Sequence, residues 1–164
     1  MKKTLMIFLL LSFALIAQVF AMAALEVNVS RITSDASSCY FGGVTIKSIG
    51  EVGIELTVEG NLGNTFDLGK IGSVKNWNLL PTLLLSLPSG EIRPYAGVGI
   101  LTIYDTQSSS FGPIDFETLY YKAGVDVFLK TMSFFAEIQG RLYYQPNWSV
   151  SGIDGWRLGV GLTF

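Results

Sequence analysis

The side chains best placed for chemistry are three carboxylates with a regular spacing. Glu51, Glu55 and Glu59 recur every four residues, so on an extended strand they point to one face. A row of carboxylates could provide acid and base catalysis or bind Ca²⁺. Salt bridges are the simpler interpretation, and we favour it because buried charges need partners. The candidate partners are Arg93, Lys122, Arg141 and Arg157.

Other common reactive groups are missing from the sequence. The chain contains no histidine, which removes Ser-His-Asp and Cys-His nucleophilic sites and histidine-ligated metals. Cys39 is the single cysteine, so no disulfide can form within the chain. No glycine-rich phosphate loop is present. We therefore predict that the protein is not an enzyme and has no cofactor and no metal.

The first residues have the pattern of an export signal. Lys2 and Lys3 precede an apolar run over residues 5–16, and small residues follow. This pattern predicts a signal peptide over residues 1–23, cleaved after Ala21 or Ala23. An uncleaved anchor is the alternative, but the run is short for a membrane span. The remaining domain, residues 24–164, has nine basic and thirteen acidic residues, and its negative charge argues against nucleic acid as a partner.

The rest of the chain alternates with the period of β-strands. The expected strands are residues 24–32, 39–47, 51–60, 76–87, 92–104, 116–129, 132–144 and 155–164. Each is close to the ~9–11 residues that a tilted strand needs to cross a membrane. In the last segment Trp156, Leu158 and Val160 share one face with Leu162 and Phe164. The sequence thus predicts an all-β fold, an eight-stranded antiparallel transmembrane β-barrel.

The polar faces of these strands hold nearly all of their charges. The charged residues on these faces are Glu26, Lys47, Glu51, Glu55, Glu59, Arg93, Lys122, Asp126, Glu137, Arg141 and Arg157. Six acids against five bases predict a network of ion pairs in the barrel interior. Apolar residues share that interior and suggest a narrow apolar path, although an interior filled by side chains is the alternative. They are Leu80, Leu84, Leu101, Ile103, Phe128, Phe135 and Tyr143.

Connections and aromatic residues favour a membrane barrel over a soluble one. Long gaps at residues 33–38, 61–75, 105–115 and 145–154 alternate with short ones, as in outer-membrane barrels with long outer loops and short periplasmic turns. Six aromatic side chains fall on the apolar face near the long loops, where a lipid–water boundary would hold them. This outer aromatic girdle consists of Tyr40, Trp77, Tyr104, Tyr121, Tyr144 and Trp156.

Three short motifs resemble those of known outer-membrane barrels. The terminal Phe164 looks like the sorting signal that the barrel assembly machinery reads. The segment Arg93-Pro94-Tyr95-Ala96-Gly97-Val98-Gly99, preceded by Leu79-Leu80-Pro81-Thr82-Leu83, resembles small outer-membrane barrels and is similar to the OmpW family in particular. The OmpA-like and OmpX-like barrels are nearly as good a match. This chain is shorter than typical OmpW-like proteins and lacks most of their first-strand and second-loop sequence.

The resemblance implies an eight-stranded barrel in the cell outer membrane that passes or binds small hydrophobic molecules. Its partners would be outer-membrane lipid and lipopolysaccharide, the assembly machinery and a possible small hydrophobic ligand. One alternative is a structural or interaction barrel with a plugged interior, whose outer loops contact a partner or lipopolysaccharide. A soluble periplasmic ligand-binding barrel is a further alternative. β-Barrel lipases, acyltransferases and lipid A deacylases of similar size need histidine, so they are disfavoured.

Overall fold

A computed structural model of the chain shows a closed antiparallel β-barrel. It describes residues 23–34, 37–87, 90–113, 118–145 and 147–164. The predicted signal peptide lies outside the described residues except for Ala23, with which the first strand begins. No helix among the described residues is long and apolar enough to span a membrane.

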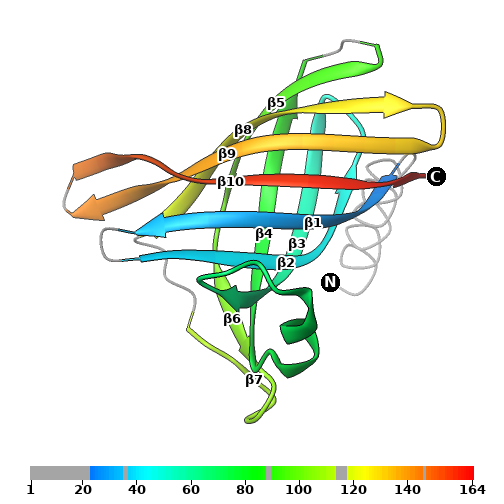
Figure 1. Ribbon diagram of the computed structural model, residues 1–164. Coiled ribbons are helices and arrows are strands. Elements are labelled where there is room, and N and C mark those ends of the chain that lie inside the picture. Colours follow the sequence, from blue (N-terminus) through cyan, green and yellow to red (C-terminus); the bar gives the residue numbers. More distant parts are fainter. Residues whose placement is uncertain (1–22, 35–36, 88–89, 114–117, 146) are drawn as a thin grey trace, which may run out of the picture.

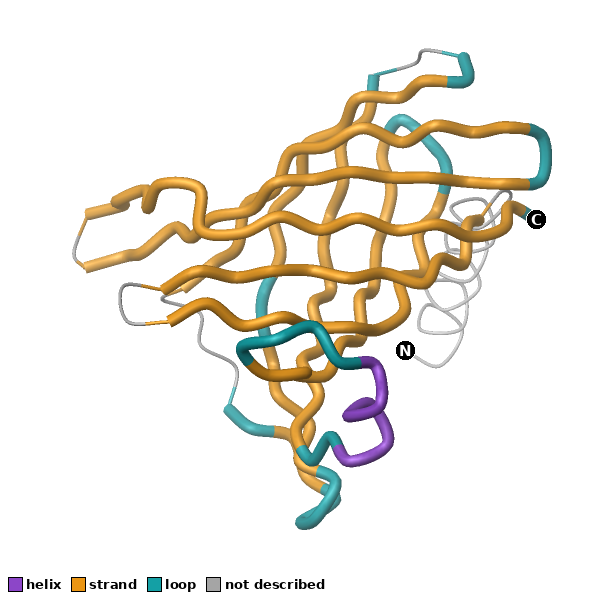
Figure 2. The backbone as a smooth tube through the Cα atoms, in the orientation of Figure 1, coloured by secondary structure: helices purple, strands orange, loops and turns teal. Residues whose placement is uncertain are grey.

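Eight strands form the barrel wall, and each pairs with two neighbours (Figures 1 and 2). The sheet runs in the order β3-β2-β1-β10-β9-β8-β5-β4, and the pairing of β3 with β4 closes it. The wall strands are β1 (Ala23–Ser34), β2 (Ser37–Ser48), β3 (Val52–Gly63), β4 (Asn76–Ser86), β5 (Ile92–Gly99), β8 (Thr118–Leu129), β9 (Met132–Gln145) and β10 (Asn147–Thr163). The prediction of an eight-stranded antiparallel barrel is therefore confirmed.

The two ends of the barrel differ in the length of their connections. The C-terminus and the two-residue turn between β8 and β9 lie at one end, while the β1–β2 and β9–β10 hairpins extend from the other (Figure 1). In the tight turn Lys130 has a φ of 55°, the left-handed conformation that two-residue hairpins require. We call the end with the extended hairpins the outer end.

Two predicted boundaries are wrong at the outer end. The segment expected as one strand over residues 92–104 forms β5 and then β6 (Thr102–Asp105), which pairs with β4 and with the short β7 (Ser110–Phe111) instead of β8. The expected loop 145–154 is mostly a continuation of β9 and β10. The strand pairing shifts register between Val150 and Ile153 and again between Ile153 and Gly155. These shifts break the apolar–polar alternation, so the sequence pattern ends before the β9–β10 pairing ends.

The connection between β3 and β4 holds the one described helical turn, the 3₁₀ helix η1 (Leu68–Ser73). Asp67 caps it by accepting a hydrogen bond from the Gly69 backbone N–H at 2.9 Å. Figure 2 shows this turn beside the barrel wall and not across the barrel mouth.

Candidate functional site

The barrel interior is filled by charged side chains from seven of the eight wall strands. Alternate residues of each strand point inward, and nine charged residues at these positions are at most 6% exposed. They are Glu26, Lys47, Glu55, Glu59, Arg93, Lys122, Asp126, Glu137 and Arg157. A shift of one residue in strand register would place these side chains on the outer wall. The alternation in the sequence therefore determines that they point into the barrel.

Lys47 is the centre of one group of ion pairs. Its Nζ lies 2.5 Å from Asp126 Oδ1 and 3.1 Å from Glu26 Oε2. Arg93 Nη2 approaches the second oxygen of Asp126 at 3.0 Å, and Arg93 Nη1 donates to the carbonyl of Gly50 at 3.3 Å. This group joins strands β1, β2, β5 and β8 near the end with the short turns.

Glu137 is the centre of the second group. One of its oxygens accepts from both Lys122, at 3.2 Å, and Arg157. The other accepts from the Tyr95 hydroxyl at 2.7 Å. Lys122 also contacts Glu55. The carboxylate therefore holds two cations and a phenol from three other strands in one buried cluster.

Neutral polar side chains connect the two groups with the wall. Asn28 donates to Thr45 Oγ1 at 2.8 Å, and Thr45 lies 2.9 Å from Thr57 Oγ1. Thr57 donates to Glu55 at 3.1 Å, and Ser30 donates to Glu59 at 3.0 Å. These residues and Tyr95 were not predicted as parts of the interior network, although their inward parity is the signal that could have identified them.

Two residues assigned to the interior network lie elsewhere. Glu51 is exposed at the end of the barrel with the short turns. Arg141 is partly exposed toward the outer end, where its Nε lies 2.8 Å from Asp154 Oδ2 and its Nη1 donates to the Tyr143 hydroxyl at 3.4 Å. The prediction that both belong to the interior network is wrong, because each lies near a strand end, where the barrel opens to solvent.

The apolar side chains expected in the interior do not form a separate path. Leu80, Leu84 and Phe135 are buried, and the Phe135 ring lies 4.0 Å from Lys47 Nζ. The guanidinium of Arg93 lies over the Phe128 ring at 5.2 Å. The aromatic faces thus contact cations, and they fill the space between charges.

The outer part of the expected apolar path falls outside the closed barrel. Ile103 lies on β6, which has left the wall, and its side chain is exposed. Leu101, in the break between β5 and β6, is half-buried. For Ile103 the prediction is wrong, because β6 pairs with β4 and β7 and, among the described residues, not with β8.

The described carboxylates are not grouped in the way that a metal ion would need. Among the residues that the structure describes, no group of three acidic or cysteine side chains is arranged to hold an ion. The carboxylates of Glu55 and Glu59 are instead neutralised by Lys122 and Arg157. The calcium and acid–base interpretations of the Glu51, Glu55 and Glu59 row therefore have no geometric support.

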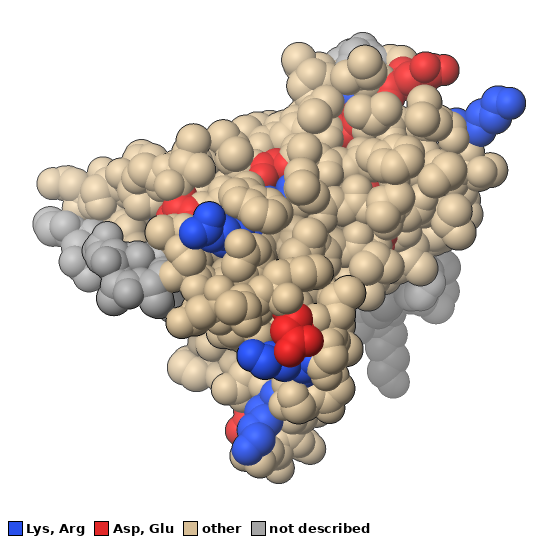
Figure 3. Space-filling view, viewed as in Figure 1, with Lys and Arg blue, Asp and Glu red and all other residues tan. Residues whose placement is uncertain are grey.

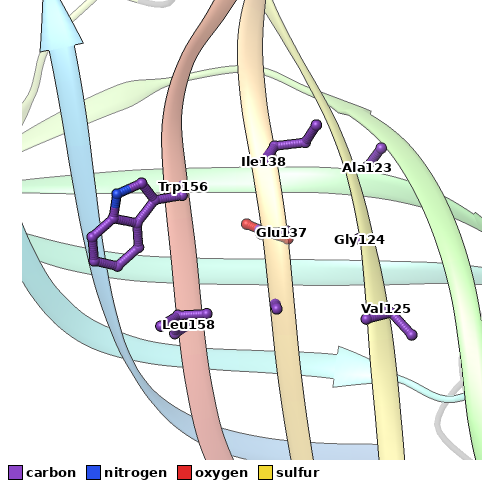
Figure 4. Close-up of a pocket in the computed structure, with 8 residues that line it drawn as sticks. Ala123, Gly124, Val125, Glu137, Ile138, Trp156 and Leu158 are labelled. Carbon is purple, nitrogen blue, oxygen red and sulfur yellow. The ribbon is translucent and has the colours of Figure 1, made fainter.

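The outer wall of the barrel is apolar and open. Val27, at the middle of β1, is 66% exposed, and the outward residues of the other wall strands are similar leucine, isoleucine and valine side chains. Figure 4 shows one shallow groove of this wall, bordered by Trp156 and Leu158 from β10, Ile138 from β9 and Val125 from β8. Small residues, among them Ala123, form its floor. The barrel is thus polar inside and apolar outside.

The residues expected in the aromatic girdle take outward positions near the outer end. Trp77 pairs with Tyr104 across β4 and β6, and the Tyr144 ring packs at a tilt against Trp148 with ring centroids 5.2 Å apart. The Tyr121 hydroxyl donates to the carbonyl of Ser151 at 2.9 Å. Tyr40 and Trp156, on β2 and β10, complete this set.

Phe164 lies at the opposite end. Its backbone N–H and C=O pair with those of Ala23 at 3.0 Å, and its side chain is exposed. Its role as an assembly signal stays a prediction.

The fold is shared with small β-barrels of known structure. The N-terminal β-barrel domain of Pseudomonas aeruginosa OprF superimposes with a TM-score of 0.55 and 18% identity, covering 87% of this chain and 97% of that domain. Neisserial surface protein A gives 0.51 and 10%, covering 87% and 94%. At these identities the likeness shows the fold alone. No family model matches the chain, and no curated protein matches its sequence.

Proposed function

We propose that this protein is a small outer-membrane barrel with a closed interior, which acts as an anchor that presents its outer hairpins. One observation carries the proposal: charged side chains are buried inside while apolar side chains cover the outside. A soluble protein has the reverse arrangement, because each Å² of apolar surface left in water costs about 25 cal/mol. A lipid bilayer is the solvent that favours this outer wall, and a closed barrel satisfies its backbone groups there.

The sequence supports the outer membrane in particular. The predicted signal peptide and the long connections at one end are typical of proteins of that membrane. The structural likeness fits the broader OmpA-like and OmpX-like group, whereas the finer resemblance to OmpW-like proteins rests on the sequence motifs. A soluble periplasmic barrel is disfavoured because its outer wall would leave rows of leucine and valine in water.

A closed interior is the arrangement that the buried charges support best. Side chains that line a water-filled channel stay accessible to water, but Lys47, Glu59 and Arg157 are fully buried. Passage of small hydrophobic molecules, which the OmpW resemblance implies, would need a continuous apolar lane. Phe135 instead packs on the Lys47 cation. An anchor or interaction role for the outer hairpins, with lipopolysaccharide as the proposed partner, remains the better interpretation.

Uptake into liposomes tests the closed interior. Folded protein is reconstituted, its barrel state is checked by its gel mobility before and after boiling, and entry of a small hydrophobic solute is followed. We expect the same rate as in empty liposomes. The matched control is Phe135→Ala, which removes a buried ring, and we expect uptake to stay equal or to rise. Faster uptake by the unchanged protein would establish a channel and overturn the proposal.

A further inference from the structure

The segment between β3 and β4, residues 64–75, folds back on the outer wall. Leu62 takes an outward position at the end of β3 yet is 0% exposed, unlike the open leucine residues elsewhere on the wall. Gly60, also outward, is buried, and a Cβ there would meet the Val74 side chain at 2.7 Å. Phe66 packs edge-on against the outward Tyr40, with ring centroids 6.1 Å apart. The segment therefore covers the outside of the wall.

The contacts of this segment fix its height on the barrel. Gly60 is paired with Trp77, and Tyr40 contacts Phe66, so both contact points lie at the aromatic girdle. Such girdles mark the boundary between lipid and water. The segment is also anchored at each end: Cys39 Sγ donates to Asn64 at 3.5 Å, and the Thr106 backbone N–H donates to the Lys75 carbonyl at 2.9 Å.

The free side of the segment is apolar and basic. Phe66 is 50% and Leu68 58% exposed, and Ile71 is exposed as well. Lys70 and Lys75 are exposed beside them, and Figure 3 shows basic side chains next to acidic ones at this end of the molecule.

Two carboxylates lie near these cations, Asp67 of the segment and Asp105 of β6, which interacts with Lys75. A further cation lies next to the segment. The acidic residue of the segment, Asp67, is engaged as the cap of η1. Arg31 adds its guanidinium over the Tyr40 ring at 5.8 Å, next to Phe66.

We propose that residues 64–75 form a lipid-binding segment, which we call the foot. This inference rests on the membrane location proposed above. Phe66, Leu68 and Ile71 enter the acyl region of the outer leaflet at the girdle. Lys70, Lys75 and Arg31 contact the phosphate groups of the lipid that forms this leaflet. Apolar side chains beside basic ones at this depth are the pattern of interfacial membrane-binding segments.

Spin labels in lipid vesicles test the position of the foot. Single cysteines replace Leu68, Val160 and Gln107 in a Cys39→Ser background, and collisions with oxygen and with a water-soluble nickel complex are compared. Val160 lies on the outer wall and Gln107 at the exposed β6–β7 turn, so they serve as lipid and water references. We expect the label at position 68 to collide more often with oxygen than with the nickel complex, as the label at position 160 does.

The outcomes separate this inference from the proposed function. A label at 68 that resembles 107, with 160 in lipid, would overturn the foot and leave the membrane barrel intact. A label at 160 that is open to the nickel complex would overturn both.

Lipid charge tests the basic half of the proposal. Lipopolysaccharide that co-elutes with the folded protein in detergent is measured for the unchanged chain, for Lys70→Gln with Lys75→Gln, and for the matched control Lys130→Gln at the opposite end. A cation near an anionic lipid surface contributes about fivefold in binding, so the double variant, which removes two cations, should retain about 25-fold less lipid. The unchanged chain should retain dephosphorylated lipopolysaccharide about as poorly as the double variant retains the phosphorylated form. Equal retention by all forms would overturn the phosphate contact.

Discussion

Arg157 on β10 and Glu59 on β3 meet inside the barrel, with Nη2 3.0 Å from Oε2. Two strands, β1 and β2, separate β10 from β3 in the sheet, so this ion pair crosses the interior. Both side chains are fully buried. The pair therefore holds opposite parts of the wall together and occupies the space that a channel would need.

Removal of one partner of this pair should destabilise the barrel strongly. Glu59→Leu leaves Arg157 only Glu137, which it shares with Lys122, and removal of one partner of a buried ion pair typically costs about 3–5 kcal/mol. The double variant Glu59→Leu with Arg157→Met should regain much of that loss, because no charge is then left without its partner. Urea unfolding in vesicles measures the difference. Glu51→Gln, at an exposed position, is the control, and an equal effect of Glu59→Leu and Glu51→Gln would contradict the network.

A charge on the outer wall should prevent stable insertion. Val160→Arg places a cation among outward leucine residues, at a cost of about 2–4 kcal/mol if the site lies near the bilayer midplane. Phe111→Arg changes an equally apolar residue on β7, outside the closed wall, and should insert normally. The folded fraction after mixing with vesicles gives the result. Normal insertion of Val160→Arg would mean that this wall does not face lipid.

Close approach of β1 and β10 predicts a glycine requirement. A Cβ at Gly161 would lie 2.0 Å from the carbonyl oxygen of Leu25, so Gly161→Ala must push two paired strands apart. At Gly152 a Cβ has nothing within 4 Å, and Gly152→Ala should fold as well as the unchanged chain. The yield of folded barrel on unboiled gels compares the two. A normal yield for Gly161→Ala would show that the strands are farther apart than described.

The β6–β7 hairpin should depend on pH through Asp105. The Gln107 backbone N–H and the Ser108 hydroxyl donate to this carboxylate at 2.8 and 2.9 Å and lower its pKa from the usual 3.8. Because folding lowers this pKa, the ionised carboxylate stabilises the hairpin at pH values above its ordinary pKa. This contribution is lost as the pH falls through the lower pKa of the folded hairpin. Carboxyl NMR shifts should show the lowered pKa, and Ser108→Ala should raise it toward normal. A pKa unaffected by Ser108→Ala would exclude the hydroxyl contact.

The wall of the barrel could be predicted because its information is local. The alternation around Val27, Val160 and Glu137 needs only the period of two to assign inside and outside. Which acid meets which base could not be predicted, since the Arg157–Glu59 contact depends on the shear of the closed barrel. The alternation gives the face of each residue and says nothing of its height relative to strands across the interior.

The outer end was harder to predict for a different reason. Around Ser151 and Gly152 the strands continue through register shifts, and a bulge removes the period on which a strand prediction depends. The contact of Val74 with Gly60 is likewise invisible in the sequence, because a loop gives no period. The exposed apolar residues Phe66, Leu68 and Ile71 are the signal that could have indicated an attached segment.

The most direct measurement of the central claim is a gel of separated membrane fractions, run with and without boiling. A closed barrel resists detergent and migrates differently from its unfolded chain. We expect the protein in the outer-membrane fraction, with a band that shifts on boiling. An unshifted band in the soluble periplasm would contradict the account, because a barrel whose outer wall faces lipid would not stay dissolved in water.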